Sequence, residues 1–353
     1  MTYLDANASE PLRPEARAAV IAALDLVGNP ASIHAAGRTA RRMMEDARTA
    51  IARQYGAAPE SLVFTSGGTE ANALAIHALR AGRRVIVGAT EHDAVRAAAP
   101  DAAVLPVDRN GVADLDALAC LLADGPALVC LMLANNETGT IQPIAAAAAL
   151  CRAHGALLHV DAVQAAGRMA CGMVGDSMVL SSHKLGGPKG AGALLLGLGT
   201  DVSPLIAGGG QERGRRGGTP ALPAIAGFAA AAGAPIPDLR ALRDAVDHAA
   251  VACGAVVLGG ADRLPNTSCL ALPGIAAGTQ VIALDLAGIE VSAGAACSSG
   301  KVARSHVLDA MGCGALAGQA IRVSLPWNAT WDDVQAFQNA YGAMAARLAK
   351  RAA

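Results

Sequence analysis

Lys184 is the residue of this sequence with the clearest chemical potential. It follows the apolar run Met178-Val-Leu180 and precedes the glycine-rich turn Gly186-Gly-Pro-Lys-Gly190. This pattern predicts a buried strand with the lysine at its carboxyl end, where open α/β sheets bind their ligands. An amine in that place can pair with an acid, reach solvent along its stem or form a Schiff base. The turn alone also fits an ordinary surface lysine.

The neighbours of Lys184 favour the covalent interpretation. Ser181, Ser182 and His183 bring hydroxyl and imidazole groups beside the amine. Such groups are suited to hold a phosphate next to a Schiff base.

A second phosphate-binding pattern lies upstream. The run Phe64-Thr-Ser-Gly-Gly-Thr-Glu70 predicts a strand, a glycine turn and a helix. The free amides near Gly68 and Thr69 would then face a ligand above the sheet. A plain turn capped by Thr69 fits the local pattern as well. Nucleotide alternatives lack their motifs, because neither GxxxxGK[ST] nor a helix-opening GxGxxG is present.

Three further residues suit a flat pyridine-type cofactor. Asp161 follows an apolar run, and a carboxylate there would keep a ring nitrogen protonated so that the ring accepts electrons. Gln164 is near enough in sequence to reach a ring hydroxyl. His92 is the best candidate to lie against the ring and move a proton, because only eight residues are aromatic. The alternatives are a helix-capping aspartate and a surface histidine.

Substrate contacts are expected from three other residues. Arg322 lies in the apolar run Ala320-Ile-Arg-Val-Ser-Leu325, which predicts a short strand. Its guanidinium would suit a bidentate grip on an α-carboxylate. Asn136, after another predicted strand, and Asn7, in the N-terminal loop, are candidate polar contacts. A surface arginine and a turn asparagine are the alternatives.

Cys297 is the candidate nucleophile. It lies in Val291-Ser-Ala-Gly-Ala-Ala-Cys-Ser-Ser-Gly300, where small side chains predict a mobile loop. A free thiol has a pKa of about 8.5, so Lys301, His306 or a substrate-bound cation would have to assist it. A buried, inert cysteine is the alternative.

Composition narrows the class of protein. The chain has 353 residues and a formal net charge of -1, which gives no long-range field to recruit nucleic acid or an anionic membrane. Two uncharged stretches, 217–237 and 264–284, contain prolines or polar residues and are not expected to span a membrane. The eight cysteines show neither a CxxC pair nor zinc-site spacing, so reduced thiols are expected. No basic and then apolar leader opens the sequence, which predicts a cytoplasmic protein.

Strand and helix patterns alternate through the first two thirds of the chain. The strands are expected at 62–65, 84–89, 102–107, 127–134, 157–160, 178–181 and 192–196, with early helices at 14–27 and 34–54. Their continuous apolar runs predict an α/β fold with a mostly parallel, seven-stranded sheet covered on both faces.

The last third has a different pattern. After an expected boundary at 228–237, helices are predicted at 238–252, 279–286 and 331–346, with short strands near Val256 and Cys269. The predicted domains are a large one, residues 14–232, and a small α+β one, residues 1–13 plus 233–353.

The motifs taken together resemble the cysteine desulfurases of the NifS/IscS type, in the class V aminotransferase family. The resemblance is carried by Ser-x-His-Lys184, by Gly28-Asn-Pro-Ala-Ser-Ile-His34 and by Ala296-Cys-Ser-Ser-Gly300, at comparable spacing and in order. It implies the aspartate-aminotransferase-like fold (fold type I) and pyridoxal 5'-phosphate (PLP) as cofactor.

The sequence departs from the family in four places. The family's Asp-Asn-Asn-Ala-Thr-Thr differs here at Ala6, Ser9 and Glu10. Alanines replace serines at 293 and 295, the region 228–238 is shortened, and Pro-Trp-Asn at 326–328 replaces Ser-Leu-Gly. The effect of the last two changes is left open by the sequence.

The resemblance also implies roles for individual residues. Lys184 would hold PLP and remove the α-proton of L-cysteine, and His92 would relay a proton. Cys297 would attack the substrate sulfur, leaving L-alanine and a persulfide for iron-sulfur cluster assembly, and would be at most a transient iron-sulfur ligand. The remaining PLP contacts would be Gly68, Thr69, Asn136, Asp161, Gln164, Ser181 and His183, with Arg322, Asn136 and Asn7 for the substrate.

Partners follow from the same resemblance. The loop 208–219 would cross the interface of a homodimer, and its Thr219 would contact the partner subunit's phosphate. An iron-sulfur scaffold protein would accept the sulfur. The sequence names neither this acceptor nor a choice between general and nitrogen-fixation roles. A selenocysteine lyase, a class V aminotransferase and a non-catalytic regulatory homologue stay open as alternatives.

Overall fold

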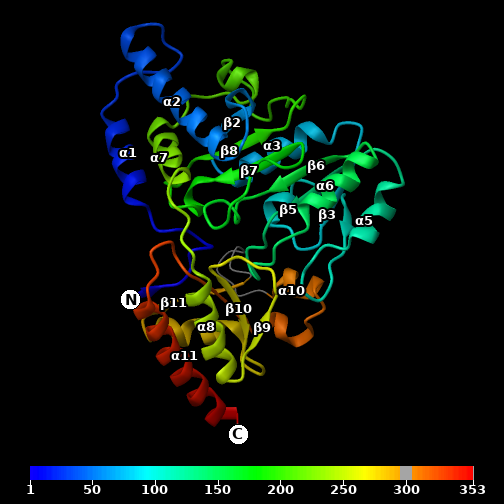
Figure 1. The fold of residues 1–353 in the computed structure, drawn as a ribbon, viewed down its shortest axis with the longest axis vertical. Coiled ribbons are helices and arrows are strands. Elements are labelled where there is room, and N and C mark those ends of the chain that lie inside the picture. Colours follow the sequence, from blue (N-terminus) through cyan, green and yellow to red (C-terminus); the bar gives the residue numbers. More distant parts are fainter. Residues whose placement is uncertain (295–303, 353) are drawn as a thin grey trace.

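A seven-stranded sheet forms the centre of the larger part of the computed structural model, which describes residues 1–294 and 304–352 (Figure 1). The strand order is β2-β8-β7-β6-β5-β3-β4, and β8 is antiparallel to both of its neighbours while the other pairs are parallel. All strands of this sheet except β8 therefore end at one edge. Their bounds are β2 Leu62–Thr65, β3 Arg84–Gly88, β4 Ala103–Leu105, β5 Ala127–Met132, β6 Leu157–Asp161, β7 Ser177–Ser181 and β8 Gly192–Leu196.

Helices cover both faces of this sheet, which explains the continuous apolar strands. In β2, for example, Leu62 and Phe64 pack in one apolar cluster and Val63 in another. The first cluster includes residues of α1 Pro14–Leu24, α2 Ala35–Gln54, α5 Leu115–Leu122, α6 Ile144–Ala153 and α7 Leu222–Ala232. The second includes residues of α3 Gly68–Leu79 and α4 Asp93–Arg96.

A smaller part with its own apolar cluster lies below this sheet in Figure 1. Its antiparallel sheet has the order β12-β13-β10-β9, and β1 pairs with β11 beside it. Leu4 packs in the same cluster, so the N-terminal segment joins residues 239–348 in this part. The strands are β1 Thr2–Tyr3, β9 Val256–Leu258, β10 Thr267–Ala271, β11 Ile289–Glu290, β12 Ser292–Ala293 and β13 Ala320–Ser324. The helices are α8 Arg240–Ala252, α9 Ala277–Asp285, α10 His306–Ala310 and α11 Trp331–Ala352.

Short 3-10 turns complete the described structure: η1 Pro59–Ser61, η2 Ser182–Lys184, η3 Gln211–Gly214 and η4 Gly314–Gly318. The expected start of the domain boundary at Phe228 was wrong, because Phe228 is fully buried within α7. A phenylalanine among alanines fits a helix packed on the core better than a linker. The limits of the two domains, 14–232 for the large one and 1–13 plus 233–353 for the small one, stay a prediction.

The seven cysteines that the structure describes are all free thiols, as the sequence predicted. Among the described residues, no helix is both long enough and apolar enough to cross a membrane.

Candidate active site

A cavity of about 210 Å3 opens at the edge of the main sheet where its parallel strands end. Nine of the ten residues predicted to bind the cofactor line it, namely Gly68, Thr69, His92, Asn136, Asp161, Gln164, Ser181, His183 and Lys184. They come from five different strand ends, so the order of strands in the sheet brings together residues that are far apart in sequence. Five lining residues were not predicted from the sequence: Asn72, Ala94, Met132, Ala134 and Val163.

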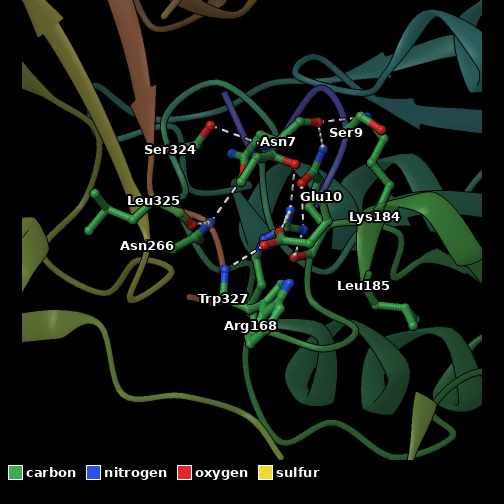
Figure 2. Close-up of polar contacts among 12 residues, drawn as sticks. Asn7, Ser9, Glu10, Arg168, Lys184, Leu185, Asn266, Ser324, Leu325 and Trp327 are labelled. Atoms are coloured by element: carbon green, nitrogen blue, oxygen red, sulfur yellow. Dashed lines mark hydrogen bonds and ion pairs between the residues drawn. The ribbon is translucent and has the colours of Figure 1, made fainter. Parts of the chain in front are cut away.

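Lys184 ends the short turn η2 that follows β7. Its Nζ donates to the carbonyl oxygen of Asn7 at 2.6 Å and to that of Ala8 at 3.0 Å. Figure 2 shows the lysine extended toward the N-terminal loop that contains Asn7. This loop comes from the smaller part of the molecule, so both parts hold the amine at the cavity wall.

The start of α3 forms a part of the site that is suited to an anion. The first hydrogen bond within α3 runs from the Ala71 amide to the Gly67 carbonyl, so the Gly68 and Thr69 amides at the helix start are not used by the helix. A Cβ atom on Gly68 would lie 2.8 Å from Val163 Cγ2, so a bare backbone is needed at this close approach. These free donors fit a phosphate group.

Ser181 and His183 add side-chain groups beside these amides. Ser181 Oγ lies 3.0 Å from His183 Nδ1. Burial, and then the positive charge of Lys184, lowers the pKa of His183 to about 4. His183 is therefore neutral at pH 7 and offers one N–H and one acceptor nitrogen.

Asp161 is oriented by a buried chain of polar side chains. Its Oδ2 accepts from Asn72 Nδ2 at 2.8 Å, and its Oδ1 accepts from the Val163 amide at 2.9 Å. Asn72 Oδ1 lies 2.8 Å from His159 Nε2, and His159 Nδ1 lies 2.7 Å from Ser177 Oγ. A carboxylate held in this way can fix the position of a protonated ring nitrogen, so the donor set fits a pyridine cofactor.

The sequence contained a signal for both residues that extend this chain. His159 is two residues before Asp161 on β6, so both side chains lie on one face of the strand. Asn72 is three residues after Thr69 on α3, and therefore lies one turn along the same side of the helix. The sequence positions of His159 and Asn72 do not show that the two side chains contact each other; only the fold shows it.

His92 lies at the cavity wall and is the N-cap of α4. Its Nδ1 accepts from the Ala94 amide at 3.0 Å, which fixes the ring beside the cavity. The preceding Glu91 is fully buried, and its Oε1 accepts from the Met132 amide at 2.6 Å. Burial, and then the charge of Asp161, raises the pKa of Glu91 well above its usual range. Sequence reasoning did not single out Glu91.

Of the three predicted substrate-binding residues, one lines the cavity and the other two hydrogen-bond to its backbone. Asn136 lines the cavity, while Arg322 and Asn7 are not among the described lining residues. Arg322 Nη1 and Asn7 Nδ2 both donate to the Asn136 carbonyl, each at 3.1 Å. Arg322 and Asn7 therefore contact the backbone of the one predicted substrate-binding residue that lines the cavity.

The two remaining predicted residues are not at the described cavity. Thr219 is exposed, at the end of a loop that ion pairs fasten to the main sheet region, among them Arg48 with Glu212 and Arg216 with Glu70. Its contact with a partner subunit stays a prediction. Cys297 lies outside the residues that the structure describes.

Comparisons with known proteins agree with this geometry. The aminotransferase class V family model matches residues 2–337. A cysteine desulfurase from Cereibacter sphaeroides is 43% identical over 348 residues, covering 92% of this chain and 90% of the relative.

Solved structures give the same result. A NifS-like protein from Rickettsia africae superposes with a TM-score of 0.89 at 32% identity, covering 98% of this chain and 99% of the other. The structure of SspA in complex with cysteine has a TM-score of 0.80 at 27% identity, covering 94% and 100%. The chain belongs to the class V aminotransferase family.

Proposed function

We infer that this chain is a PLP-dependent cysteine desulfurase, which converts L-cysteine to L-alanine and leaves the sulfur as a persulfide on Cys297. The observation that carries the inference is the position of Lys184 Nζ at the wall of a cavity that also holds Asp161 and the free amides of α3. An amine, an acid and an anion site are the three groups that PLP requires. Relatives named cysteine desulfurase match nearly the whole chain, which supports the same activity here.

Each residue has a distinct task in this proposal. When bound, PLP supplies a protonated ring that accepts the electron pair released as the substrate loses its α-proton. Lys184 would hold the cofactor and then take that proton, while Asp161 would keep the ring nitrogen protonated. The Gly68 and Thr69 amides, with Ser181 and His183, would hold the phosphate.

The rest of the site would bind the substrate and direct the sulfur. Arg322, Asn136 and Asn7 would hold the carboxylate of L-cysteine, and His92 would lie against the ring and relay a proton. The Cys297 sulfur would attack the substrate sulfur, forming a sulfur-sulfur bond as the carbon-sulfur bond breaks. The remaining three-carbon fragment would take up one proton on its β-carbon and one on its α-carbon, which balance the α-proton and the thiol proton that the substrate loses, and would leave as alanine.

A homodimer is part of the proposal. Four large apolar side chains on α1 and the segment after it are exposed: Ile21, Leu24, Val27 and Ile33. Large apolar side chains exposed close together in sequence support an association surface here. The dimer, the contact of Thr219 across it, an iron-sulfur scaffold as acceptor and the cytoplasmic location stay predictions.

The absorption spectrum of the pure protein tests cofactor and substrate together. We expect a visible band from bound PLP, which shifts when L-cysteine is added, and alanine as a product. Lys184→Ala is the matched variant, because it keeps the phosphate site and removes the amine. Wild-type protein that shows no band with added PLP, or Lys184→Ala protein that forms alanine at the wild-type rate, would overturn the proposal.

A further inference from the structure

A buried ion pair lies behind the cavity and is not explained by the chemistry above. Glu10 Oε2 accepts from Arg168 Nη2 at 3.0 Å, and both side chains are 4% exposed. Burying two charges is costly unless further hydrogen bonds satisfy them. The contacts of each partner show what the pair holds in place.

Arg168 determines the orientation of the Gln164 side chain. Its Nη1 donates to Gln164 Oε1 at 2.9 Å and to the Gln164 carbonyl at 3.1 Å. A guanidinium can only donate, so the Gln164 amide must turn its oxygen to Arg168 and its nitrogen away. Gln164 Nε2 then donates one hydrogen to the Asn7 carbonyl at 3.0 Å, which leaves its second N–H for the cavity that Gln164 lines.

The same network reaches the lysine. The Asn7 carbonyl accepts from Gln164 Nε2 and also from Lys184 Nζ. Arg168 Nη2 additionally donates to the Ala6 carbonyl at 3.0 Å, one residue before Asn7. Arg168 therefore fixes the loop that holds the Lys184 amine from two sides.

Glu10 connects this network to the segment between β13 and α11. Its Oε1 accepts from the Trp327 amide at 2.6 Å, and Figure 2 shows Glu10 between Arg168 and Trp327. The Trp327 indole donates to the Pro11 carbonyl at 3.0 Å, and the Glu10 amide donates to the His183 carbonyl at 2.9 Å. Glu10 and Trp327 belong to two of the segments in which this sequence departs from the family pattern, and the fold brings the two departures into direct contact.

We propose that Glu10 and Arg168 are positioning residues for the cofactor site, which act mainly by fixing the orientation of the Gln164 side-chain amide. Neither residue touches the reacting atoms. The inference rests on the proposed function, because the Gln164 N–H would serve the ring hydroxyl of PLP.

A double-mutant cycle between Arg168 and Gln164 tests the proposal. Arg168→Met is made in the wild-type protein and in the Gln164→Ala variant, and the affinity for PLP is measured by equilibrium dialysis. The pH titration of the visible absorption band is recorded for the same four proteins. We expect Arg168→Met to weaken PLP binding by about tenfold in the wild-type background, the scale of a lost charged hydrogen bond. In the Gln164→Ala background, Arg168→Met should change the affinity for PLP less than about threefold. It should also leave the midpoint of the pH titration of the visible band unchanged.

Two further variants keep the test valid if Arg168→Met does not fold. Arg168→Lys keeps the charge but loses the planar donor pair, and Glu10→Gln keeps the shape but loses the charge and one acceptor oxygen. Each enters the same cycle with Gln164→Ala. Arg80→Met is the matched control, because it breaks a more exposed ion pair, with Asp101, and neither of these residues lines the cavity.

The outcomes separate the two proposals. Equal fold-changes in both backgrounds, or a lower melting temperature of the cofactor-loaded protein with unchanged PLP affinity and titration, would overturn the positioning role and leave the proposed function intact. Wild-type protein that does not bind PLP would overturn the proposed function itself.

Discussion

The guanidinium of Arg322 is paired with the carboxylate of Asp5. The Arg322 Nη2 atom lies 2.7 Å from Asp5 Oδ1, and the Arg322 side chain is 4% exposed while that of Asp5 is 21% exposed. β13 supplies the arginine and the N-terminal loop supplies the aspartate. A buried arginine therefore already has an anionic partner before any substrate carboxylate arrives.

Replacing Asp5 tests whether Asp5 and a ligand carboxylate compete for the guanidinium of Arg322. Asp5→Asn keeps the shape of the side chain but removes its charge, which leaves a buried guanidinium without compensation. We expect the melting temperature of the unliganded enzyme to fall and the stabilisation by L-alanine, the product, to increase. Binding energy is gained when the ligand carboxylate supplies the missing charge.

Thermal unfolding with and without L-alanine measures both effects. Arg322→Met is the control and should abolish the stabilisation by L-alanine whether or not Asp5 is changed. An Asp5→Asn protein that responds to L-alanine less than the wild type does would contradict this account of the carboxylate site.

Cys297→Ser distinguishes a desulfurase from other enzymes that use the same cofactor. The variant should keep the PLP spectrum, because Cys297 has no proposed role in holding the cofactor. Formation of alanine and persulfide from L-cysteine should be abolished, since a hydroxyl is a far weaker nucleophile toward sulfur than a thiolate. Mass spectrometry of the protein and alanine analysis give the two readouts. Sustained conversion of cysteine by the variant would favour a selenocysteine lyase or an aminotransferase.

Gly68→Ala tests the anion site at the start of α3. The added Cβ would lie 2.8 Å from Val163 Cγ2, so the helix start must move away from the strand end that carries Asp161. We expect PLP affinity to fall by about tenfold or more, because the backbone donors shift relative to the phosphate. Val163→Ala removes the clashing methyl group, and the double variant should recover most of the affinity in equilibrium dialysis. No recovery in the double variant would show that the glycine is required for another reason.

Much of the large sheet could be predicted from apolar runs alone. β2 and β8 have the predicted ends, and Arg322 lies on β13 as expected. These features depend on local burial, which leaves a signal in neighbouring residues. The predicted strand at 102–107 is shorter in the structure, Ala103–Leu105, because local pattern does not show where pairing with β3 stops.

The supporting residues of the site were harder to predict. Asn72 and His159 are 87 residues apart, and Glu10 and Arg168 are 158 apart. A polar residue in an apolar segment shows that it needs a partner, but only the fold shows which one. Glu10 was visible in the sequence only as a departure from a family pattern, and its function in holding Arg168 and Trp327 required the structure.

The pH dependence of stability should reveal the buried His159. Burial lowers the pKa of His159 to about 4, whereas an unfolded histidine titrates near 6.5. As the pH falls below about 6.5, the unfolded state takes up a proton that the folded state does not bind, so stability is lost. The loss continues down to the folded pKa of about 4 and then stops. Between pH 7 and pH 5 this one group should cost about 2 kcal/mol of unfolding free energy.

Urea unfolding of wild-type and His159→Gln proteins at pH 7 and pH 5 measures this term. Glutamine can still hydrogen-bond Asn72 or Ser177 but has no proton to gain, so the variant should lose about 2 kcal/mol less than the wild type over this interval. His183 has the same depressed pKa and contributes in the same window in both proteins, so it cancels in the comparison. Equal losses in the wild type and His159→Gln would mean that His159 takes up its proton at the same pH in the folded and the unfolded protein, which would contradict the effect of burial.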